Sequence, residues 1–382
     1  MNPYTFKIPQ TVEFGVGALA KLPSILDELG SEHVFLVSDR MLESIGVVGK
    51  VTSIVERAGI DCTCFLEVEP NPTVAIVETA AEAYAASGAT SIIALGGGSP
   101  MDVAKAVGVL ATFGGNITDY EGANKIPDRI LPLIAIPTTA GTGSEATASA
   151  VITDVERNYK FSVVSYNILP AYALLDPELI MTAPAGVAAS CGVDAFIHAM
   201  EAYVSRNASP FTDAVAEKAM QLIGANIRRF VACRQDAEAA SAMMVGSNLA
   251  GIAFAWARLG NIHAMSHPVS AYFHVAHGVA NAVLMPTVVE YNALADNGRY
   301  RVIFDAIRGC NDPIERFEPS MLVDELRRLN ADLGLPASLS EVGVTEDTFE
   351  AMAEDAMKSV NVPANPRQTT KRDIIALYKK AL

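Results

Sequence analysis

The chain has 382 residues, of which 51% are apolar and 7% aromatic, and its formal net charge at pH 7 is −15. This length predicts two domains of ordinary size, with enough apolar residues to give each its own core. The negative charge argues against nucleic acid and anionic membrane surfaces as partners, because both require clusters of Lys and Arg. Residues 1–10 lack the basic region and apolar core of a signal peptide, and the five cysteines lack the spacing of a disulfide framework. We therefore expect a soluble, cytoplasmic protein.

The first half of the chain alternates between two periodicities. Short apolar, β-branched runs predict strands at 33–39, 62–68, 91–95 and 131–136, and Ala-rich stretches with helical spacing lie between them at 73–87 and 101–111. Strands that alternate with helices predict a parallel sheet covered on both faces, with ligands bound at the carboxyl ends of the strands.

The second half loses the strand pattern. Long helices are predicted at 185–204, 210–229, 237–257 and 278–294. The apolar stretch at 243–257 contains small polar residues and is interpreted as a buried helix rather than a membrane span. We therefore predict an α/β + all-α protein, in which residues 1–185 form a dinucleotide-binding domain and residues 186–382 an all-helical domain. An active site is expected in the cleft between the two.

Two glycine motifs compete for the role of a phosphate-binding loop. Gly15, Gly17 and Ala20 fit the spacing G-x-G-x-x-A, with Asp39 lying 19 residues beyond Ala20. The segment before them, 11–14, is short and charged, whereas a first strand of this fold is central and buried. We interpret this motif as a plain turn.

The second motif, Gly96-Gly97-Gly98, follows the apolar strand at 91–95 and precedes a helix with Pro100 near its start. Three glycines let backbone N–H groups approach a pyrophosphate, and the helix dipole favours the anion. Asp39 can then serve the adenosine ribose and repel a 2′-phosphate, which favours NAD over NADP. A third loop at 137–145, rich in hydroxyl groups, is expected at the same edge of the sheet.

A metal site is predicted in the second half. Four of the six histidines fall within fifteen residues, namely His263, His267, His274 and His277. His198 stands four residues after Asp194 on a predicted helix, so both side chains share one face. One Asp with two or three His around an open coordination position suits Fe²⁺ or Zn²⁺.

The segments GGGSPMDVAK, PTTAGTGSE, DAFIHAMEAY and HAMSHPVSAYFHVAHGVANAVLMP together resemble the iron-containing alcohol dehydrogenase family, to which lactaldehyde reductases and propanediol dehydrogenases belong. The resemblance runs from about Phe14 to Arg367. It implies an N-terminal dinucleotide-binding domain, a helical domain that holds Fe²⁺ (or Zn²⁺), NAD(H) as cofactor, and a homodimer or larger homo-oligomer.

Site residues follow from the resemblance by position. It implies the metal ligands Asp194, His198, His263 and His277, and it places His267 near the nicotinamide as a catalytic residue without a bond to the metal. For the cofactor it implies Asp39, Asn71, Gly97, Gly98, Ser99, Asp102, Thr138, Thr139, Thr142, Thr147 and Lys160. The metal would polarise a carbonyl, and NADH would deliver the hydride.

Four positions that would line the substrate pocket are Ser149, Phe254, Arg258 and Asn361. Arg258 lies four residues after Phe254, and on a continuous helix both would face one cavity. A guanidinium there would suit a short anionic aldehyde, with sulfoacetaldehyde (reduced to isethionate) first and succinate semialdehyde second.

Several alternatives remain open. One is a dehydrogenase for neutral substrates such as lactaldehyde or 1,3-propanediol. Others on the same fold are glycerol oxidation and elimination from a sugar phosphate. A nucleotide- and metal-binding module without catalysis is the non-enzymatic alternative.

Overall fold

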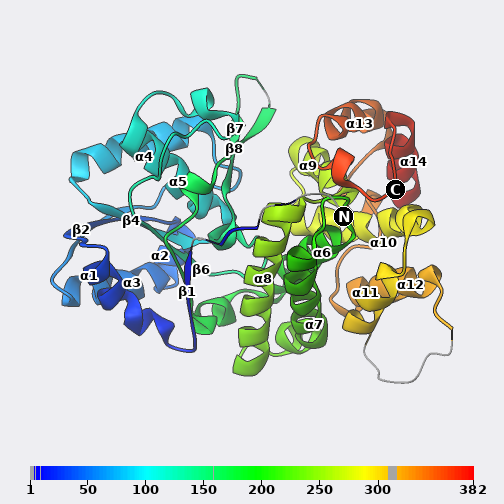
Figure 1. Cartoon of the computed structure of the whole chain (residues 1–382), viewed down its shortest axis with the longest axis horizontal. Helices are drawn as coiled ribbons and strands as arrows, with labels where there is room; N and C mark the ends of the chain where they lie inside the picture. The colour runs from blue at the N-terminus through cyan, green and yellow to red at the C-terminus, as the bar shows by residue number, and fades with distance from the viewer. Residues whose placement is uncertain (1–3, 5, 9, 158, 309–315) are drawn as a thin grey trace. The chain divides into compact units, whose positions relative to one another are not determined.

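The computed structural model describes residues 4, 6–8, 10–157, 159–308 and 316–382. It contains two compact units. We call Lys7–Thr139 with Gly143–Thr182 the α/β unit, and Ala140–Thr142 with Ala183–Leu382 and an N-terminal segment that includes Phe6 the helical unit. Figure 1 shows the course of the chain. The domain boundary predicted between residues 185 and 186 stays a prediction.

The α/β unit is built on a six-stranded sheet in which all described pairings are parallel. Its strand order is β1 (Thr11–Phe14), β9 (Tyr172–Leu175), β6 (Leu133–Pro137), β4 (Ser91–Gly96), β2 (His33–Val37) and β3 (Asp61–Phe65). The helices of this unit are α1 (Leu22–Glu28), α2 (Arg40–Ser44), α3 (Val47–Arg57), α4 (Val74–Ser87) and α5 (Gly98–Phe113). The predicted parallel sheet is therefore confirmed.

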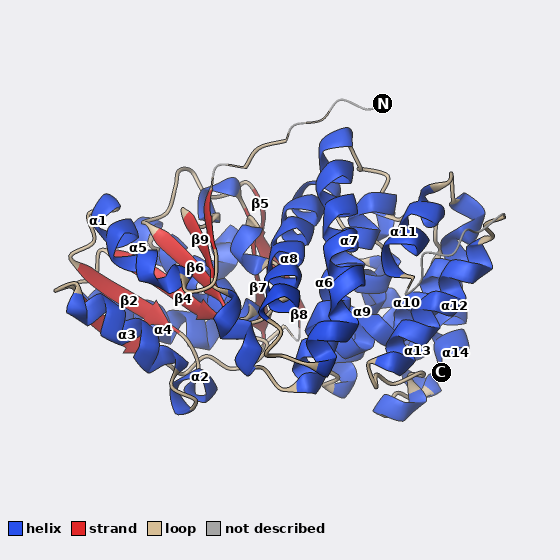
Figure 2. Cartoon of the chain, turned by 90° about the horizontal axis from the view of Figure 1, so that it is seen from below, coloured by secondary structure: helices blue, strands red, loops and turns tan. Residues whose placement is uncertain are grey.

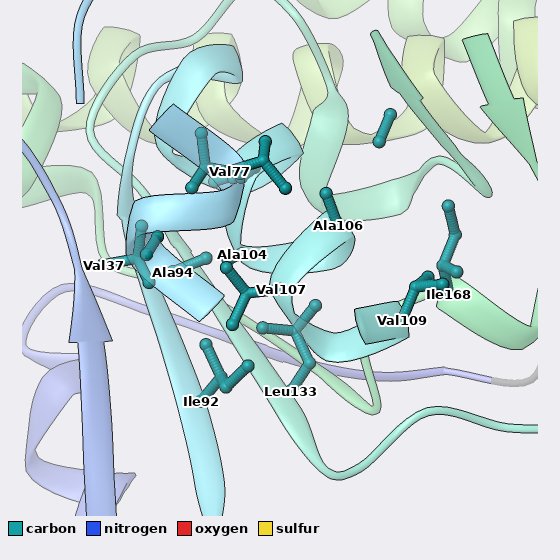
Figure 3. Packing of buried hydrophobic residues seen from close by; sticks show 14 of the residues in the cluster. Val37, Val77, Ile92, Ala94, Ala104, Ala106, Val107, Val109, Leu133 and Ile168 are labelled. Carbon is teal, nitrogen blue, oxygen red and sulfur yellow. The ribbon is translucent and has the colours of Figure 1, made fainter. Parts of the chain in front are cut away.

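The central strands are buried on both faces because their side chains alternate between two apolar cores. In β4, Ile92 and Ala94 belong to one core, and Ile93 and Leu95 belong to the other. Figure 3 shows Ile92 and Ala94 close to side chains of α5 such as Val107. A strand covered on both faces has apolar residues pointing both ways, and the unbroken apolar run at 92–95 made this strand recognisable without an alternating pattern.

A second, three-stranded sheet of β5 (Gly122–Ala123), β8 (Tyr159–Val164) and β7 (Ser149–Asp154) was not predicted. Strands β7 and β8 pair antiparallel, with Ser149 opposite Val164. Their residues alternate between buried and accessible positions and include several polar side chains. Such short, half-buried strands give a weak local signal.

Among its described residues, the helical unit contains helices and no strand (Figure 2). Its helices are α6 (Ala185–Val204), α7 (Pro210–Ala232), α8 (Ala237–Ala257), α9 (Asn261–Phe273), α10 (His277–Asn292), α11 (Arg299–Ile307), α12 (Pro319–Asp332), α13 (Phe349–Met357) and α14 (Lys371–Ala381). Helices α6, α7 and α8 pack against one another, and α10 contacts α6, α9, α12 and α14. All four helices predicted in this half are present.

Helix α8 is, in the described part of the chain, the one helix long and apolar enough to cross a membrane. However, 61% of its apolar window is buried inside the protein. This burial fits the core helix that the sequence predicted.

Candidate dinucleotide and metal sites

The turn at Gly15 and Gly17 follows β1 at the edge of the large sheet. The backbone N–H groups of Gly17 and Leu19 donate to the carboxylate of Asp176, at 3.1 Å each. Asp176 is fully buried. A carboxylate of the protein therefore occupies the place that a phosphate would take in a dinucleotide fingerprint, which fits the interpretation of this motif as a turn.

The glycine loop between β4 and α5 has the geometry of an anion site. Gly97 is the N-cap of α5 and makes no side-chain cap, and Gly98 and Ser99 form the start of the first turn. The N–H groups of this first turn have no partner within the helix, and they form the positive end of the helix dipole, where an anion is favoured. Gly96 has a φ of +148°, and a methyl group on it would lie 2.6 Å from Cγ of Pro100. The backbone turn thus requires glycine at this position.

The hydroxyl-rich loop lies beside the glycine loop, as expected. Gly96 pairs with Pro137 at the ends of β4 and β6, and the N–H of Thr138 donates to the Gly96 carbonyl at 3.0 Å. A methyl group on Gly97 would lie 3.4 Å from Oγ1 of Thr139. The predicted phosphate loop and two predicted cofactor residues therefore share one edge of the sheet.

A buried lysine, which the sequence analysis did not single out, fixes this second loop. Nζ of Lys105 on α5 donates to the carbonyls of Ser144 and Ser149 at 2.8 Å each, and to the hydroxyls of Ser144 and Thr147 at 3.2 and 3.1 Å. Burial lowers the pKa of Lys105 to about 8. The hydroxyl of Thr147, a predicted cofactor residue, and the backbone of Ser149, a predicted substrate residue, are thus engaged by this ammonium group.

Asp102, also on α5, helps Lys105 to hold the hydroxyl-rich loop in place. Its carboxylate accepts hydrogen bonds from the Ser144 hydroxyl and the Val151 N–H, both at 3.2 Å. Burial raises its pKa to about 6. These bonds tie α5 to the hydroxyl-rich loop and to β7, so Asp102 shapes the region in which a cofactor contact is predicted.

The remaining predicted cofactor residues do not form a single cluster. Asp39 lies just after β2 and caps α2, accepting from the N–H of Leu42 at 2.9 Å. Nζ of Lys160 on β8 donates to Oδ1 of Asn71 at 2.7 Å, so these two predicted residues do meet. Thr142 belongs to the helical unit.

The four predicted metal ligands come from three helices of the helical unit. Asp194 and His198 lie on α6, His263 on α9, and His277 at the start of α10. Oδ1 of Asp194 is 3.5 Å from Nε2 of His263 and 3.9 Å from Nε2 of both His198 and His277. Ligand atoms of Asp194, His263 and His277 lie within 4.8 Å of one another. A carboxylate and two imidazoles this close together can hold one metal ion, and His198 lies beside them through its contact with Asp194.

The electrostatics of the cluster fit a bound cation. Asp194, His198 and His263 are at most 5% exposed. Burial opposes ionisation of Asp194, but the imidazoles of His198, His277 and His263 outweigh it and lower the pKa of the carboxyl group. Burial also lowers the pKa of His198 to about 4, which leaves a neutral imidazole as metal ligation requires. At His263 the carboxylates of Asp194 and Glu201 outweigh burial and raise the pKa to about 9, so a bound metal would displace a proton from this ring.

Asn281, one turn after His277 on α10, was missed by the sequence analysis. Its Nδ2 lies 2.6 Å from Oδ1 of Asp194 and 3.1 Å from Nε2 of both His263 and His277. Its buried Oδ1 has no hydrogen-bond partner among the described residues. Three electron-rich atoms thus converge on an electropositive amide group, and the same three atoms suit a divalent ion.

Hydrogen bonds at Nδ1, on the ring edge away from Asp194, orient two of the imidazoles. Nδ1 of His198 lies 3.2 Å from the carbonyl of Gly141, and Nδ1 of His263 lies 2.7 Å from Oε2 of Glu201. Since a carbonyl and a carboxylate only accept, both Nδ1 atoms donate, and Nε2 of each ring is left on the side of Asp194, where a metal would be bound. Glu201 stands three residues after His198. A carboxylate one turn after His198, on a helix whose other charged residue is the predicted ligand Asp194, was the signal that could have identified it.

The predicted catalytic and substrate residues differ in their surroundings. The ring of His267 is exposed, with its centroid 5.3 Å from that of His277. The ring of Phe254 stacks on His198 with centroids 4.5 Å apart. Asn361 is buried in the helical unit, whereas Ser149 belongs to the α/β unit.

Arg258 requires a correction. The expected i, i+4 arrangement with Phe254 is wrong, because α8 ends at Ala257 and Arg258 follows it with a φ of +67°. Its side chain is exposed. The left-handed backbone turns the chain away from the helical path, so spacing along the helix no longer determines where this guanidinium lies.

Comparisons with known proteins cover the whole chain. Residues 9–177 match the profile described as iron-containing alcohol dehydrogenase, and residues 188–382 match that of the C-terminal part of the Fe-containing alcohol dehydrogenase family. An NAD-dependent methanol dehydrogenase of Bacillus methanolicus is 36% identical over 99% of both chains. A lactaldehyde reductase of Escherichia coli K12 is also 36% identical, over 97% of this chain and 98% of the relative.

Solved structures agree. A 1,3-propanediol oxidoreductase superposes with a TM-score of 0.96 at 35% identity over 100% of both chains. A sulfoacetaldehyde reductase of Bifidobacterium kashiwanohense, solved in complex with NAD⁺, gives a TM-score of 0.90 at 28% identity over 100% of this chain and 99% of that one.

Proposed function

We propose a function that starts from one established fact: the chain belongs to the iron-containing alcohol dehydrogenase family. It is an NAD-dependent oxidoreductase that interconverts alcohols and aldehydes, with NAD(H) and Fe²⁺ as cofactors, as the sequence predicted. The proposal concerns which residues act and on which substrate.

The observation that carries the proposal is the convergence of one carboxylate and three imidazoles in the helical unit. We assign Asp194, His198, His263 and His277 as the ligands of the iron. Zn²⁺ suits the same donors. When bound, the ion supplies a Lewis acid that polarises the substrate C–O group.

The chain's own residues bind and orient the cofactor. The N–H groups of Gly97, Gly98 and Ser99 bind the pyrophosphate, and Thr138 and Thr139 lie next to them. Asp39 accepts hydrogen bonds from the adenosine ribose through the oxygen that does not cap α2, and its charge repels a 2′-phosphate. Lys105 holds the second loop in place from inside the protein.

His267 is assigned as the proton-transfer residue. Its ring is exposed and lies beside His277, so it can pass a proton between the substrate oxygen and solvent. A group with this role needs access to water, and the exposed imidazole of His267 has it.

For the substrate, a short neutral aldehyde or alcohol is the first candidate. The relatives that are 36% identical include enzymes named for methanol, 1,3-propanediol and lactaldehyde. Phe254, which stacks on His198, places an apolar ring beside the metal ligands.

A short anionic aldehyde such as sulfoacetaldehyde is the second candidate, with succinate semialdehyde after it. Two observations favour it: Arg258 directly follows the helix that carries Phe254, and a structural neighbour is named as a sulfoacetaldehyde reductase. Because Arg258 is exposed, its pairing with an anion would contribute only about 0.2–1 kcal/mol, or roughly 1.4- to 5-fold in kcat/KM.

The test is NADH oxidation with propanal, lactaldehyde, sulfoacetaldehyde and succinate semialdehyde, by metal-free protein and by protein loaded with Fe²⁺ or Zn²⁺. We expect metal-dependent turnover with at least one short aldehyde and a preference for NADH over NADPH. Binding of NADH and metal without turnover of any member would favour the non-catalytic module. The ratio of kcat/KM for sulfoacetaldehyde to that for propanal separates the two substrate candidates.

A further inference from the structure

A buried carboxylate stands directly behind one of the proposed metal ligands. Glu201 on α6 is 3% exposed. Its Oε2 accepts a hydrogen bond from Nδ1 of His263 at 2.7 Å, and its Oε1 accepts one from the backbone N–H of Ile262 at 2.8 Å. Both oxygens of one carboxylate are therefore bound to consecutive residues at the start of α9.

The start of α9 depends on these distant acceptors. Gly260, the residue before the helix, has no side chain with which to cap it. The N–H of Asn261 donates instead to Oδ1 of Asn365 at 3.2 Å, and that of Ile262 donates to Glu201. A buried carboxylate at this position is favoured by the positive end of the helix dipole.

Gly260 makes this approach possible. A methyl group there would lie 2.9 Å from Oε1 of Glu201 and 3.0 Å from Oδ1 of Asn365. Any larger residue would push the two acceptors away from the helix. The glycine, the carboxylate and the amide thus form one arrangement that fixes where α9 begins.

Asn365 is itself held firmly. It exchanges hydrogen bonds with Asn292 on α10, at 3.0 and 2.8 Å, and donates to the carbonyl of Arg367 at 2.7 Å. The acceptors at the start of α9, Glu201 and Asn365, are therefore linked to α6, to α10 and to the C-terminal segment around Asn365. Such a support limits the movement of His263, the third residue of α9.

We propose that Glu201 is a positioning residue of the metal centre. It fixes the orientation and tautomer of His263 so that Nε2 faces the metal, and the same carboxylate caps the helix that carries this ligand. The inference rests on the proposed function in one respect, namely that His263 binds the metal.

The two hydrogen bonds require a carboxylate. Glu201 meets two donors, the imidazole N–H and the backbone N–H, so both of its terminal atoms must accept. A glutamine has one acceptor, and its amide group would face an N–H group at the second position. The substitution Glu201→Gln therefore breaks one bond and removes the charge, while it keeps the size of the side chain.

The experiment measures metal binding instead of turnover, with Co²⁺ as the probe. The affinity for Co²⁺ is determined by competition with a chelator, and the ligand geometry is followed by the visible d–d absorption. We expect Glu201→Gln to bind Co²⁺ about 10- to 100-fold more weakly than wild type, with an altered d–d spectrum. Affinity for NADH should not change.

Glu325→Gln is the matched control. Glu325 on α12 is also buried, and it pairs with Arg228 at 3.0 Å. The same chemical change there should affect stability and leave Co²⁺ affinity and spectrum at the wild-type values. Equal Co²⁺ affinities and spectra for wild type, Glu201→Gln and Glu325→Gln would overturn the proposal.

Two further variants keep the outcome interpretable. Glu201→Asp retains the charge but is one methylene shorter, so it cannot reach both N–H groups, and we expect it to bind Co²⁺ more weakly than wild type and more tightly than Glu201→Gln. If Glu201→Gln does not fold, wild-type Co²⁺ binding by Glu201→Asp overturns the proposal. His263→Ala tests the premise: unchanged Co²⁺ binding would reject the proposed metal site, and with it this inference. If His263→Ala loses Co²⁺ while Glu201→Gln does not, the inference about Glu201 alone fails.

Discussion

Gly278 controls the spacing between two helices that carry proposed metal ligands. It follows His277 on α10, and a methyl group on it would lie 2.4 Å from the carbonyl oxygen of Ser190 and 2.8 Å from the carbonyl carbon. Ser190 is on α6, one turn before Asp194. Because the obstacle is helix backbone, which cannot rotate away as a side chain can, Gly278→Ala must move α10 relative to α6.

The size of this movement follows from the contact distance. Ordinary contacts begin at 3.4 Å, so the helices must separate by about 1.0 Å (3.4 minus 2.4). Metal sites tolerate errors of about 0.2 Å in ligand distance. Nε2 of His277 lies 3.9 Å from Oδ1 of Asp194, and a shift of 1 Å exceeds the tolerance several-fold. Overpacking of this kind also costs about 1–3 kcal/mol in the free energy of unfolding.

The assay combines metal content after purification, Co²⁺ affinity by chelator competition, and denaturant unfolding of the metal-free protein. Gly186→Ala is the control, because Gly186 also lies on α6 and no atom would come within 4 Å of the added methyl group. We expect weaker metal binding and lower stability for Gly278→Ala, and neither for Gly186→Ala. Wild-type metal affinity and stability in Gly278→Ala would refute the reasoning.

Four further variants test the two sites and the substrate preference. Lys105→Met should destabilise the protein by about 1–3 kcal/mol for each buried carbonyl left without its donor, measured by denaturant unfolding. The pKa of Lys105 is about 8 in the folded protein, against 10.5 unperturbed, so the unfolded chain binds more protons between these values. The stability of wild type relative to Lys105→Met should therefore rise as the pH increases from 8 to 10.5. Asp39→Ser keeps an oxygen to cap α2 while it removes the charge, so the ratio of kcat/KM for NADPH to that for NADH should increase without loss of stability; a wild type that already prefers NADPH would contradict the role of Asp39. Asp194→Ala should lose metal and activity together, as shown by metal analysis beside the aldehyde assay, and full activity of a metal-free variant would exclude the proposed centre. Arg258→Ala should lower kcat/KM for sulfoacetaldehyde by no more than about 5-fold and spare propanal; equal losses on both substrates would argue against any contact with the anion.

Some features of this protein were predictable because their signals are local. Strand β4 is apolar at every position from 92 to 95 because the sheet is covered on both faces. Glycines directly after that strand predicted the loop at the start of α5. Asp194 and His198 could be paired from spacing alone, since residues four apart share a helix face.

Other features depended on contacts between residues that are far apart in the sequence. The convergence of Asp194, His263 and His277 needs α6, α9 and α10 at a fixed spacing, which Gly278 permits. Nothing near Glu201 in the sequence indicates that its carboxylate binds a helix start about sixty residues later. Lys105 similarly meets its acceptors 39 to 44 residues away.

The residue types therefore determined which chemistry is available, and the tertiary structure decided which groups meet. Arg258 shows the limit: the apolar helical pattern continues up to Ala257, and only the backbone, with a φ of +67° at the next residue, reveals that the helix ends there. A periodic pattern describes one helix at a time. Packing between helices, and the backbone turns that end them, are set by atoms that come together only in the folded chain.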